Sequence, residues 1–410
     1  MKANNELTKN LFNTTVLVSA LGYFVDIYDL ILFGIVRIPS LIDLGVSGEG
    51  LITTGVFLLN MQMAGMLFGG IAFGIWGDKK GRLSVLFGSI ALYSIANFAN
   101  AFVTNTDMYA VLRFIAGVGL AGELGAAVTL VSETMTKETR GYGTAIVASI
   151  GVTGAIFAAI VGEFFNWKIA YIIGGILGFI LLGARIKMYE SGMYNSLKTA
   201  SVGKGKFSAL FTSKDRFVRY ANCILVGLPI WYVVGVLITF SPEFGKVLGV
   251  SEPVKAGNSI LFTYTGLIFG DFASGFLSQY LKSRKKIYTI FISLTALFIL
   301  FYLFVHGLPI EMFYGLCILL GIAIGYWAVF VTTASEQFGT NLRSTVTTTV
   351  PNFIRGTVVP ITLAFNFLRE YVGMISSALI VGIICILIAF WALYHLEETY
   401  GKDLNYLEDI

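Results

Sequence analysis

A small set of ionisable side chains stands inside long apolar stretches of this 410-residue chain. A charge placed in hydrocarbon costs free energy, so residues of this kind are candidate functional groups. The set has four acids and two arginines, namely Asp26, Asp29, Glu123, Asp271, Arg113 and Arg355. Because arginine stays protonated, the excess of acids predicts that some of the carboxyls bind and release a proton during function.

Two of these groups are expected to lie at the same depth. The helical rise of about 1.5 Å per residue places Asp29 and Arg113 roughly 22 and 23 Å from one face of the membrane. We therefore expect them to form an ion pair that couples protons to a conformational change. Asp26, about one helical turn away, is the alternative partner, and Glu123 lies about 15 Å deeper than Arg113. Each acid could instead belong to a static structural pair.

Arg355 is a cation near the middle of its apolar stretch, between Pro351 and Pro360. A guanidinium binds a carboxylate or phosphate through two parallel hydrogen bonds, so Arg355 predicts an anionic substrate. The alternative is a structural pair with Asp271. Polar and aromatic residues from neighbouring stretches complete the predicted substrate-binding set, namely Asp271, Asn352, Trp231, Tyr232, Tyr326 and Trp327.

The elements that position these residues are predicted to be membrane-spanning helices. The chain is 56% hydrophobic and only 13% charged, whereas a soluble protein has roughly 25% charged residues. A span needs about 20 apolar residues. Twelve spans are predicted near 14–36, 51–76, 83–103, 108–132, 142–165, 168–187, 217–241, 257–281, 287–305, 310–333, 344–368 and 372–395.

The basic residues predict the orientation of these spans. Of the 28 Lys and Arg residues, 21 fall in one set of alternating gaps and five in the other. Cytoplasmic loops have an excess of Lys and Arg, so this asymmetry predicts an inner-membrane protein with both termini in the cytoplasm. The net charge of +4 is small and does not indicate a nucleic-acid partner.

The spans divide into two related halves. Glu133 and Glu336 are 203 positions apart, as are Arg140 and Arg343, and basic loops near 79–82 and 282–285 share the same offset. This predicts an N-terminal six-helix half at 1–187, a cytoplasmic linker at 188–216 and a C-terminal six-helix half at 217–410. Transporters with paired repeats bind substrate between the halves, near the bilayer midplane.

The loop after the second span has the sequence Gly77-Asp78-Lys79-Lys80-Gly81-Arg82. It resembles the G-x-x-x-D-[RK]-x-G-[RK] loop motif of the major facilitator superfamily. In the second half Leu281 stands in the place of Asp78. Charges near these loops are expected to form a cytoplasmic latch that breaks when that side opens. Its predicted members are Gly77, Asp78, Gly81, Arg82, Glu133, Arg140, Glu336 and Arg343.

The resemblance implies a secondary transporter that alternates between inward- and outward-facing states. The first-span Asp26 and Asp29, together with Arg113 on the fourth span, are similar to the metabolite:proton symporter and sugar porter branches, where such residues couple protons to transport. We therefore predict proton-coupled symport of a small polar metabolite, with an organic anion favoured over a neutral sugar. The alternatives are a proton-antiport exporter and a sugar-type porter or uniporter.

Other classes of protein fit the sequence less well. The chain has no H-E-x-x-H or G-x-S-x-G motif, which argues against an intramembrane enzyme. A channel does not need two repeated halves or a latch. The three cysteines and two histidines do not have the spacing of a metal site. We expect a monomer with no cofactor, whose partners are its substrate, protons and the lipid bilayer.

Overall fold

The computed structural model describes residues 14–80, 82–125, 127, 140–190, 207–402 and 407–408. All regular elements within these ranges are helices, in agreement with the predicted all-α membrane fold. The helices before residue 191 are α2 (Thr14–Asp43), α3 (Gly50–Lys80), α4 (Arg82–Asn100), α5 (Thr106–Leu120), α7 (Arg140–Phe164) and α8 (Trp167–Glu190).

The helices after residue 206 include several short pieces. They are η2 (Phe207–Phe211), α9 (Lys214–Leu225), α10 (Leu228–Tyr232), η3 (Val233–Ile238), α11 (Ser241–Val247), α12 (Ala256–Tyr280), α13 (Arg284–Phe304), α14 (Ile310–Ile324), α15 (Trp327–Glu336), α16 (Thr340–Gly356) and α17 (Val358–His395).

These helices supply the twelve predicted spans. Nine stretches in the described residues are long and apolar enough to cross a membrane, and α9 with α10 and η3, bent by 40°, forms another. The shorter apolar helix α4 occupies the place of the predicted third span. The longest stretch, Thr345–His395, is interrupted at Gly373, whose φ of 78° and ψ of 174° are not helical. It therefore provides the eleventh and twelfth spans.

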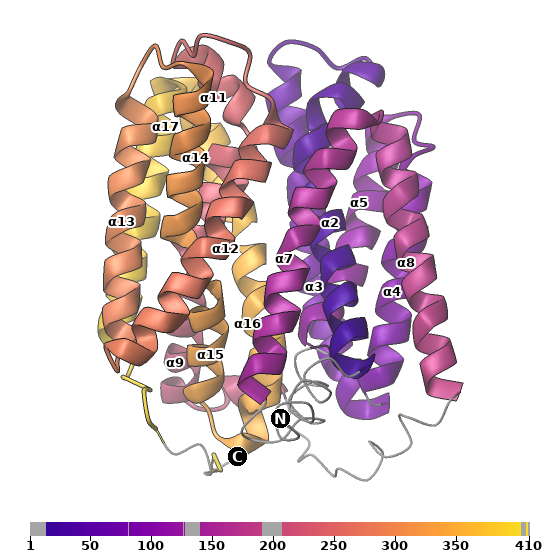
Figure 1. Ribbon diagram of the computed structural model, residues 1–410, viewed down its shortest axis with the longest axis vertical. Helices are drawn as coiled ribbons and strands as arrows, with labels where there is room; N and C mark the ends of the chain where they lie inside the picture. Colours follow the sequence, from indigo (N-terminus) through magenta and orange to yellow (C-terminus); the bar gives the residue numbers. More distant parts are fainter. Residues whose placement is uncertain are drawn as a thin grey trace, which may run out of the picture.

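The first six spans and the last six form two groups that stand side by side (Figure 1). Helices α2, α3 and α7 meet α12, α16 and α17 along the seam between them. In Figure 1 the loop between α2 and α3 lies at the upper end. "Upper" and "lower" are used below in that sense, and "first half" and "second half" denote the two groups.

The two halves repeat the same packing. Gly65 and Gly69 on α3 approach the backbone of α5, where an added Cβ would lie 2.1 and 2.3 Å from carbonyl oxygens. Gly266 and Gly270 on α12 approach α14 in the same way, at 2.2 and 2.3 Å. Small residues permit such close contact between helices in lipid. The predicted pseudo-symmetry is therefore present in the helix contacts.

Two spans depart from the continuous helices that the sequence predicts, and a third is longer than predicted. The seventh bends by 40° just before Pro229 and continues as the π-helical segment η3. The tenth breaks at Gly325 and Tyr326, between α14 and α15. The first continues to Asp43, beyond the predicted end at residue 36, and so includes Arg37 within a helix. Broken helices in membranes expose backbone groups that line cavities or need partners, so these breaks locate candidate sites.

Candidate substrate and proton site

The centre of the seam holds a buried cluster of charged and aromatic side chains from both halves. Arg355 on α16 lies 3.7 Å from a carboxylate oxygen of Asp26 on α2, and their exposed fractions are 1% and 0%. The Arg355 guanidinium is 5.8 Å from the ring centroids of both Trp231 and Trp327. Arg355 is thus the point where the two halves and the aromatic residues meet.

The two indole rings form a wall beside Arg355. Trp231 and Trp327 pack edge to face, with centroids 6.3 Å apart and planes inclined by 74°. The buried indole N–H of Trp231 has no hydrogen-bond partner in the described part of the chain. Buried polar groups are usually paired. The Trp231 N–H and the Arg355 guanidinium are therefore available to a polar ligand.

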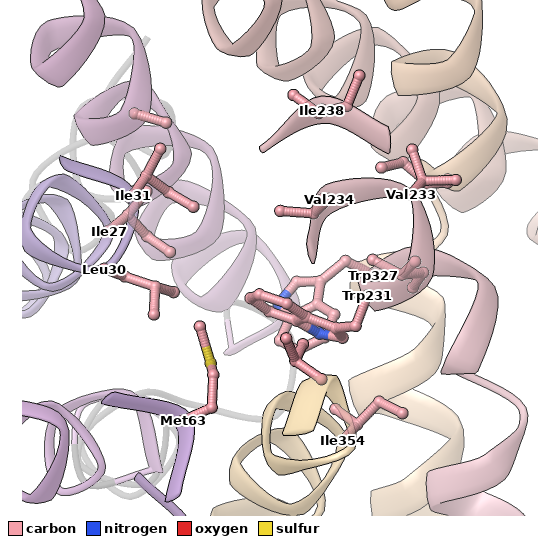
Figure 2. Packing of buried hydrophobic residues seen from close by; sticks show 14 of the residues in the cluster. Ile27, Leu30, Ile31, Met63, Trp231, Val233, Val234, Ile238, Trp327 and Ile354 are labelled. Carbon is pink, nitrogen blue, oxygen red and sulfur yellow. The ribbon is translucent and has the colours of Figure 1, made fainter. Parts of the chain in front are cut away.

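A small apolar cavity lies against Trp231 at the seam (Figure 2). Its volume is about 20 Å³, which is enough for about one water molecule. The lining residues come from both halves and are Leu30, Ile31, Gly34, Leu59, Met63, Trp231, Val234, Gly235, Thr239 and Ile260. A space of this volume is too small to hold a metabolite.

The other predicted binding residues have structural contacts. The hydroxyls of Tyr232 and Tyr326 donate to the backbone carbonyls of Ala378 at 2.6 Å and Val226 at 3.2 Å. Asn352 donates to the carbonyl of Ala121 at 2.8 Å, which joins α16 to the first half. Of the predicted aromatic residues, Trp231 and Trp327 are the two that face Arg355.

Asp271 on α12 faces the break in the tenth span. Its Oδ1 accepts a hydrogen bond of 3.1 Å from the backbone N–H of Ala328, in the first turn of α15. A helix N-terminus has unpaired N–H groups and a partial positive charge, which a carboxylate stabilises. The alternative partner predicted for Arg355 was Asp271, but the structure pairs Arg355 with Asp26.

Arg113 does not form the predicted ion pair with Asp29 in this structure. Instead, Arg113 donates to the side-chain oxygen of Gln62 and, at 3.4 Å, to the hydroxyl of Tyr171. Its guanidinium also lies 4.5 Å from the ring centroid of Phe33. The matched depth was not sufficient, because the sequence does not show which face of each helix points toward the other. Both carboxylate oxygens of Asp29 are buried without a hydrogen-bond partner among the described residues.

Glu123 has a partner that the sequence did not suggest. Arg185 on α8 donates two hydrogen bonds to its carboxylate, at 3.1 and 2.5 Å, and both side chains are buried. Arg185 stands near the end of the predicted sixth span, where a basic residue is expected to set the orientation of the chain in the membrane. This two-pronged pair lies wholly within the first half and has the geometry of a structural contact.

Most of the predicted latch lies outside the described residues. This is true of Gly81 and Glu133, and of the side chains of Asp78, Arg82 and Arg140; Gly77 is described only as part of the α3 backbone. In the second half, Glu336 accepts from Arg284 at 2.9 and 3.2 Å and from the hydroxyl of Thr399 at 2.7 Å. Arg343 donates instead to the carbonyls of Ser335 and Phe338.

A further carboxylate joins this lower cluster. Glu398 follows α17 and accepts hydrogen bonds from the Ser283 hydroxyl at 2.5 Å and from the N–H groups of Arg284 and Lys285 at 2.8 and 3.2 Å. Partial burial acts to raise the pKa of Glu398, but these hydrogen bonds outweigh it and lower the pKa below its usual value. Glu398 thus supplies a negative charge to the loop that has Leu281 where the first half has Asp78.

The main site residue that sequence reasoning missed is Arg37. It is fully buried, donates to Glu243 at 2.6 Å and to the carbonyls of Leu51 and Thr239 at 3.1 and 3.3 Å, and so joins the halves at the upper end. The signal in the sequence was the scarcity of Lys and Arg in the predicted outer gaps. A cation that is not needed for orientation is a candidate for an ion pair.

The sequence of this chain is similar to those of known membrane transporters. The model of the Major Facilitator Superfamily matches residues 19–361. A putative niacin/nicotinamide transporter of Bacillus subtilis, NiaP, is 26% identical over 387 residues, which cover 90% of this chain and 94% of that protein.

Two further relatives have names that specify aromatic acids. A gentisate transporter of Corynebacterium glutamicum is 24% identical over 92% of this chain and 86% of its own length. A benzoate transport protein of Acinetobacter baylyi is 30% identical over 41% of this chain and 37% of its own length. These relatives are transporters and not enzymes.

Proposed function

The chain belongs to the Major Facilitator Superfamily and is an integral membrane transporter, and we propose that it transports a small aromatic carboxylate together with a proton. The single observation that supports this substrate class best is the buried Arg355 guanidinium beside two indole rings. A guanidinium selects a carboxylate, and indole faces stack on a flat ring. The names of the gentisate and benzoate transporters agree with an aromatic carboxylate, while the name of NiaP includes both an acid and its neutral amide.

Transport by alternating access is part of the proposal. The space beside Trp231 holds about one water molecule, so substrate must reach Arg355 through a state in which the halves have separated at one end. We propose that the lower end faces the cytoplasm of the cell, since the basic loops near 79–82 and 282–285 belong to that end. Asp26 or Asp29 on α2 would provide the proton-binding carboxyl.

The proposal is tested by ligand pairs that differ in one property. Nicotinate and nicotinamide share a ring and differ in charge, while benzoate and cyclohexanecarboxylate share the charge and differ in the flat ring. A ligand that binds only the folded protein raises its melting temperature. Purified protein should be stabilised by nicotinate or benzoate more than by either matched analogue. Equal stabilisation by the neutral amide would contradict the proposed anion site.

Arg355→Lys provides the matched variant. Lysine keeps the positive charge but cannot form two parallel hydrogen bonds. Losing one partner of a buried hydrogen-bonded charge pair costs about 2–5 kcal/mol. The variant should therefore bind nicotinate roughly a hundredfold more weakly, with little change for the amide. In liposomes, a pH gradient should drive accumulation of the anion by the parent protein.

A further inference from the structure

We propose that Asp26 and the substrate carboxylate exchange places on Arg355, and that Asp26 takes up one proton when it is displaced. This inference rests on the proposed function, because it requires an anionic substrate at Arg355. It adds which acid is the proton carrier, and why proton binding and anion binding depend on each other. It also predicts one proton for each anion transported.

The geometry of the Asp26–Arg355 contact suits an exchange. At 3.7 Å the two groups are an ion pair but not a hydrogen-bonded one, and neither oxygen of Asp26 has a hydrogen-bond partner in the described ranges. The Nε and Nη1 atoms of Arg355 are likewise without hydrogen-bond partners there. By contrast, Arg185 holds Glu123 with two hydrogen bonds. Arg355 thus has donors to offer to an incoming carboxylate.

The charges near Asp26 require a proton when the exchange happens. With Asp26 ionised, its pair with Arg355 is neutral, and a bound substrate anion would leave one uncompensated negative charge in a buried site. Such a charge costs several kcal/mol. A proton from solution that adds to the Asp26 carboxylate restores neutrality. The O–H bond formed on Asp26 replaces the bond that held the proton in the hydronium ion or buffer acid that gives it up, and no oxidation or reduction is involved.

The groups that face Asp26 do not replace this proton. They are Glu123, which Arg185 already neutralises, the acid Asp29 one turn along α2, and the hydroxyls of Tyr23 on α2 and Tyr93 on α4. On the other side of the seam stands Asp271, which interacts with Tyr23 and the N-terminus of α15. None of these groups brings a positive charge that could replace Arg355.

The exchange also explains the position of the pair across the seam. Asp26 belongs to the first half and Arg355 to the second, so the ion pair holds the empty site closed. The substrate carboxylate breaks this link by taking the guanidinium, and protonation removes the attraction altogether. Substrate and proton together would therefore free the halves to move and leave no uncompensated charge in the site.

The first experiment counts protons. Nicotinate added to purified protein in weakly buffered solution with a pH indicator should cause uptake of about one proton per bound anion near neutral pH. By linkage, its affinity should fall about tenfold per pH unit once Asp26 ionises in the free protein. Asp26→Asn should bind the anion with no proton uptake and with a flat pH profile. Asp43→Asn, a half-exposed acid at the upper end of the same helix, is the control and should keep the proton uptake and pH dependence of the parent.

The outcomes separate this inference from the proposed function. If Asp26→Asn still takes up a proton when the anion binds, Asp26 is not the carrier and only the inference fails. If neither nicotinate nor benzoate binds the parent protein, the proposed function fails and the inference fails with it.

A second experiment needs no variant and so does not depend on the folding of Asp26→Asn. Symport of one proton with each monovalent anion moves no net charge across the membrane. In liposomes, an imposed pH gradient should drive accumulation of nicotinate, and an imposed potassium-diffusion potential should not change the accumulation ratio. If the accumulation ratio of nicotinate responds to the potential, the proposed stoichiometry of one proton per anion is wrong, although transport of the anion is established.

Discussion

Among the residues that the structure describes, the seam between the halves has different chemistry at its two ends. At the upper end, three ion pairs between described residues cross it, namely Arg37–Glu243, Glu163–Lys255 and Glu49–Arg369. Toward the lower end the described contacts across the seam are close packing. Gly125 meets Thr348, Gly70 meets Asn352 and Gly356 meets Leu67, and Asn352 donates to the carbonyl of Ala121.

This difference gives the few outer cations a role beyond orientation. Five Lys and Arg residues fall in the predicted outer gaps, and three of them, Arg37, Lys255 and Arg369, are in the pairs that cross the seam. The ion pairs of the second half's lower end, such as Arg284–Glu336, lie within that half. Charges therefore join the halves at the upper end, and hold one half together at the lower end.

Of the substitutions that test this difference, removal of Arg37 should have the largest effect on how the seam closes. Arg37→Gln leaves the Glu243 carboxylate without its buried partner, and breaking such a pair costs about 3–5 kcal/mol. The upper end should open more often, with an open-to-closed ratio raised by roughly a hundredfold to several thousandfold. Spin labels at Ser47 and Glu252, which are exposed on upper loops of opposite halves, should report longer distances.

The matched control for this experiment is the double variant Arg37→Gln with Glu243→Gln. It removes the same ion pair without leaving a buried charge, so it should open the upper end less than the single variant does. Labels at the lower end, at Ala184 and Lys286, should not report longer distances in either protein. Unchanged distances at Ser47 and Glu252 in Arg37→Gln would show that this pair does not hold the end closed.

The sequence predicted the twelve spans and the repeat because both depend on patterns along the chain. Lipid excludes unpaired backbone groups, so each crossing must be a long apolar helix that the sequence displays. The seventh and tenth spans broke the pattern, near Pro229 and at Gly325, while Gly373 separates the eleventh span from the twelfth. The sequence showed the glycines and the proline, but not that a tertiary contact such as Asp271 with Ala328 would stabilise one of the broken ends.

The partners of the buried charges were much harder to predict. Depth along a helix follows from counting residues, but the direction of a side chain depends on how each helix is rotated against its neighbours. Thus Asp29 and Arg113 have similar expected depths and yet Arg113 binds Gln62. Glu123 pairs with Arg185, and Asp26 with Arg355. Arg355 lies on α16, whereas the partner that depth suggested for Asp26 was Arg113 on α5, and Arg185 on α8 was not predicted as a partner at all.

Enlarging Gly125 tests the packed end of the seam. A Cβ there would lie 2.5 Å from Thr348 Cγ2 and 2.7 Å from Thr348 Oγ1, so the halves or the threonine must shift. Overpacking of this kind costs about 1–3 kcal/mol. Gly125→Ala should lengthen the distance between labels at Ala184 and Lys286 and leave the upper distance unchanged. Gly74→Ala is the control, since nothing lies within 4 Å of its added Cβ. Equal distances in the two variants would mean that the packing at Gly125 does not close the seam.

Glu398→Gln tests whether the lower charges act within one half. The pKa of Glu398 is lowered in the folded protein, so its stabilising effect is present above the usual carboxyl pKa and is lost as the pH falls through the lowered value. The variant should reduce thermal stability at neutral pH, by about 1 kcal/mol as for a lost helix cap, and the difference from the parent should vanish in acid. Distances across the seam at both ends should stay as in the parent. A change in those distances would show that this cluster also controls the seam.

Lys255→Gln should have the smallest effect, and it isolates the contribution of burial. The Lys255–Glu163 and Arg37–Glu243 pairs have the same N–O distance of 2.6 Å and both cross the seam at the upper end. Their side chains differ in exposed fraction, 61% and 44% against 0% and 16%.

Glu163 raises the pKa of Lys255, so the lysine stays charged at physiological pH and the pair is complete. Water and salt nevertheless screen an exposed pair, so its removal should change the Ser47–Glu252 distances only at low ionic strength. Arg37→Gln should have its effect at any ionic strength. If both variants instead respond to salt in the same way, the upper end is closed by the number of ion pairs and not by the burial of one of them.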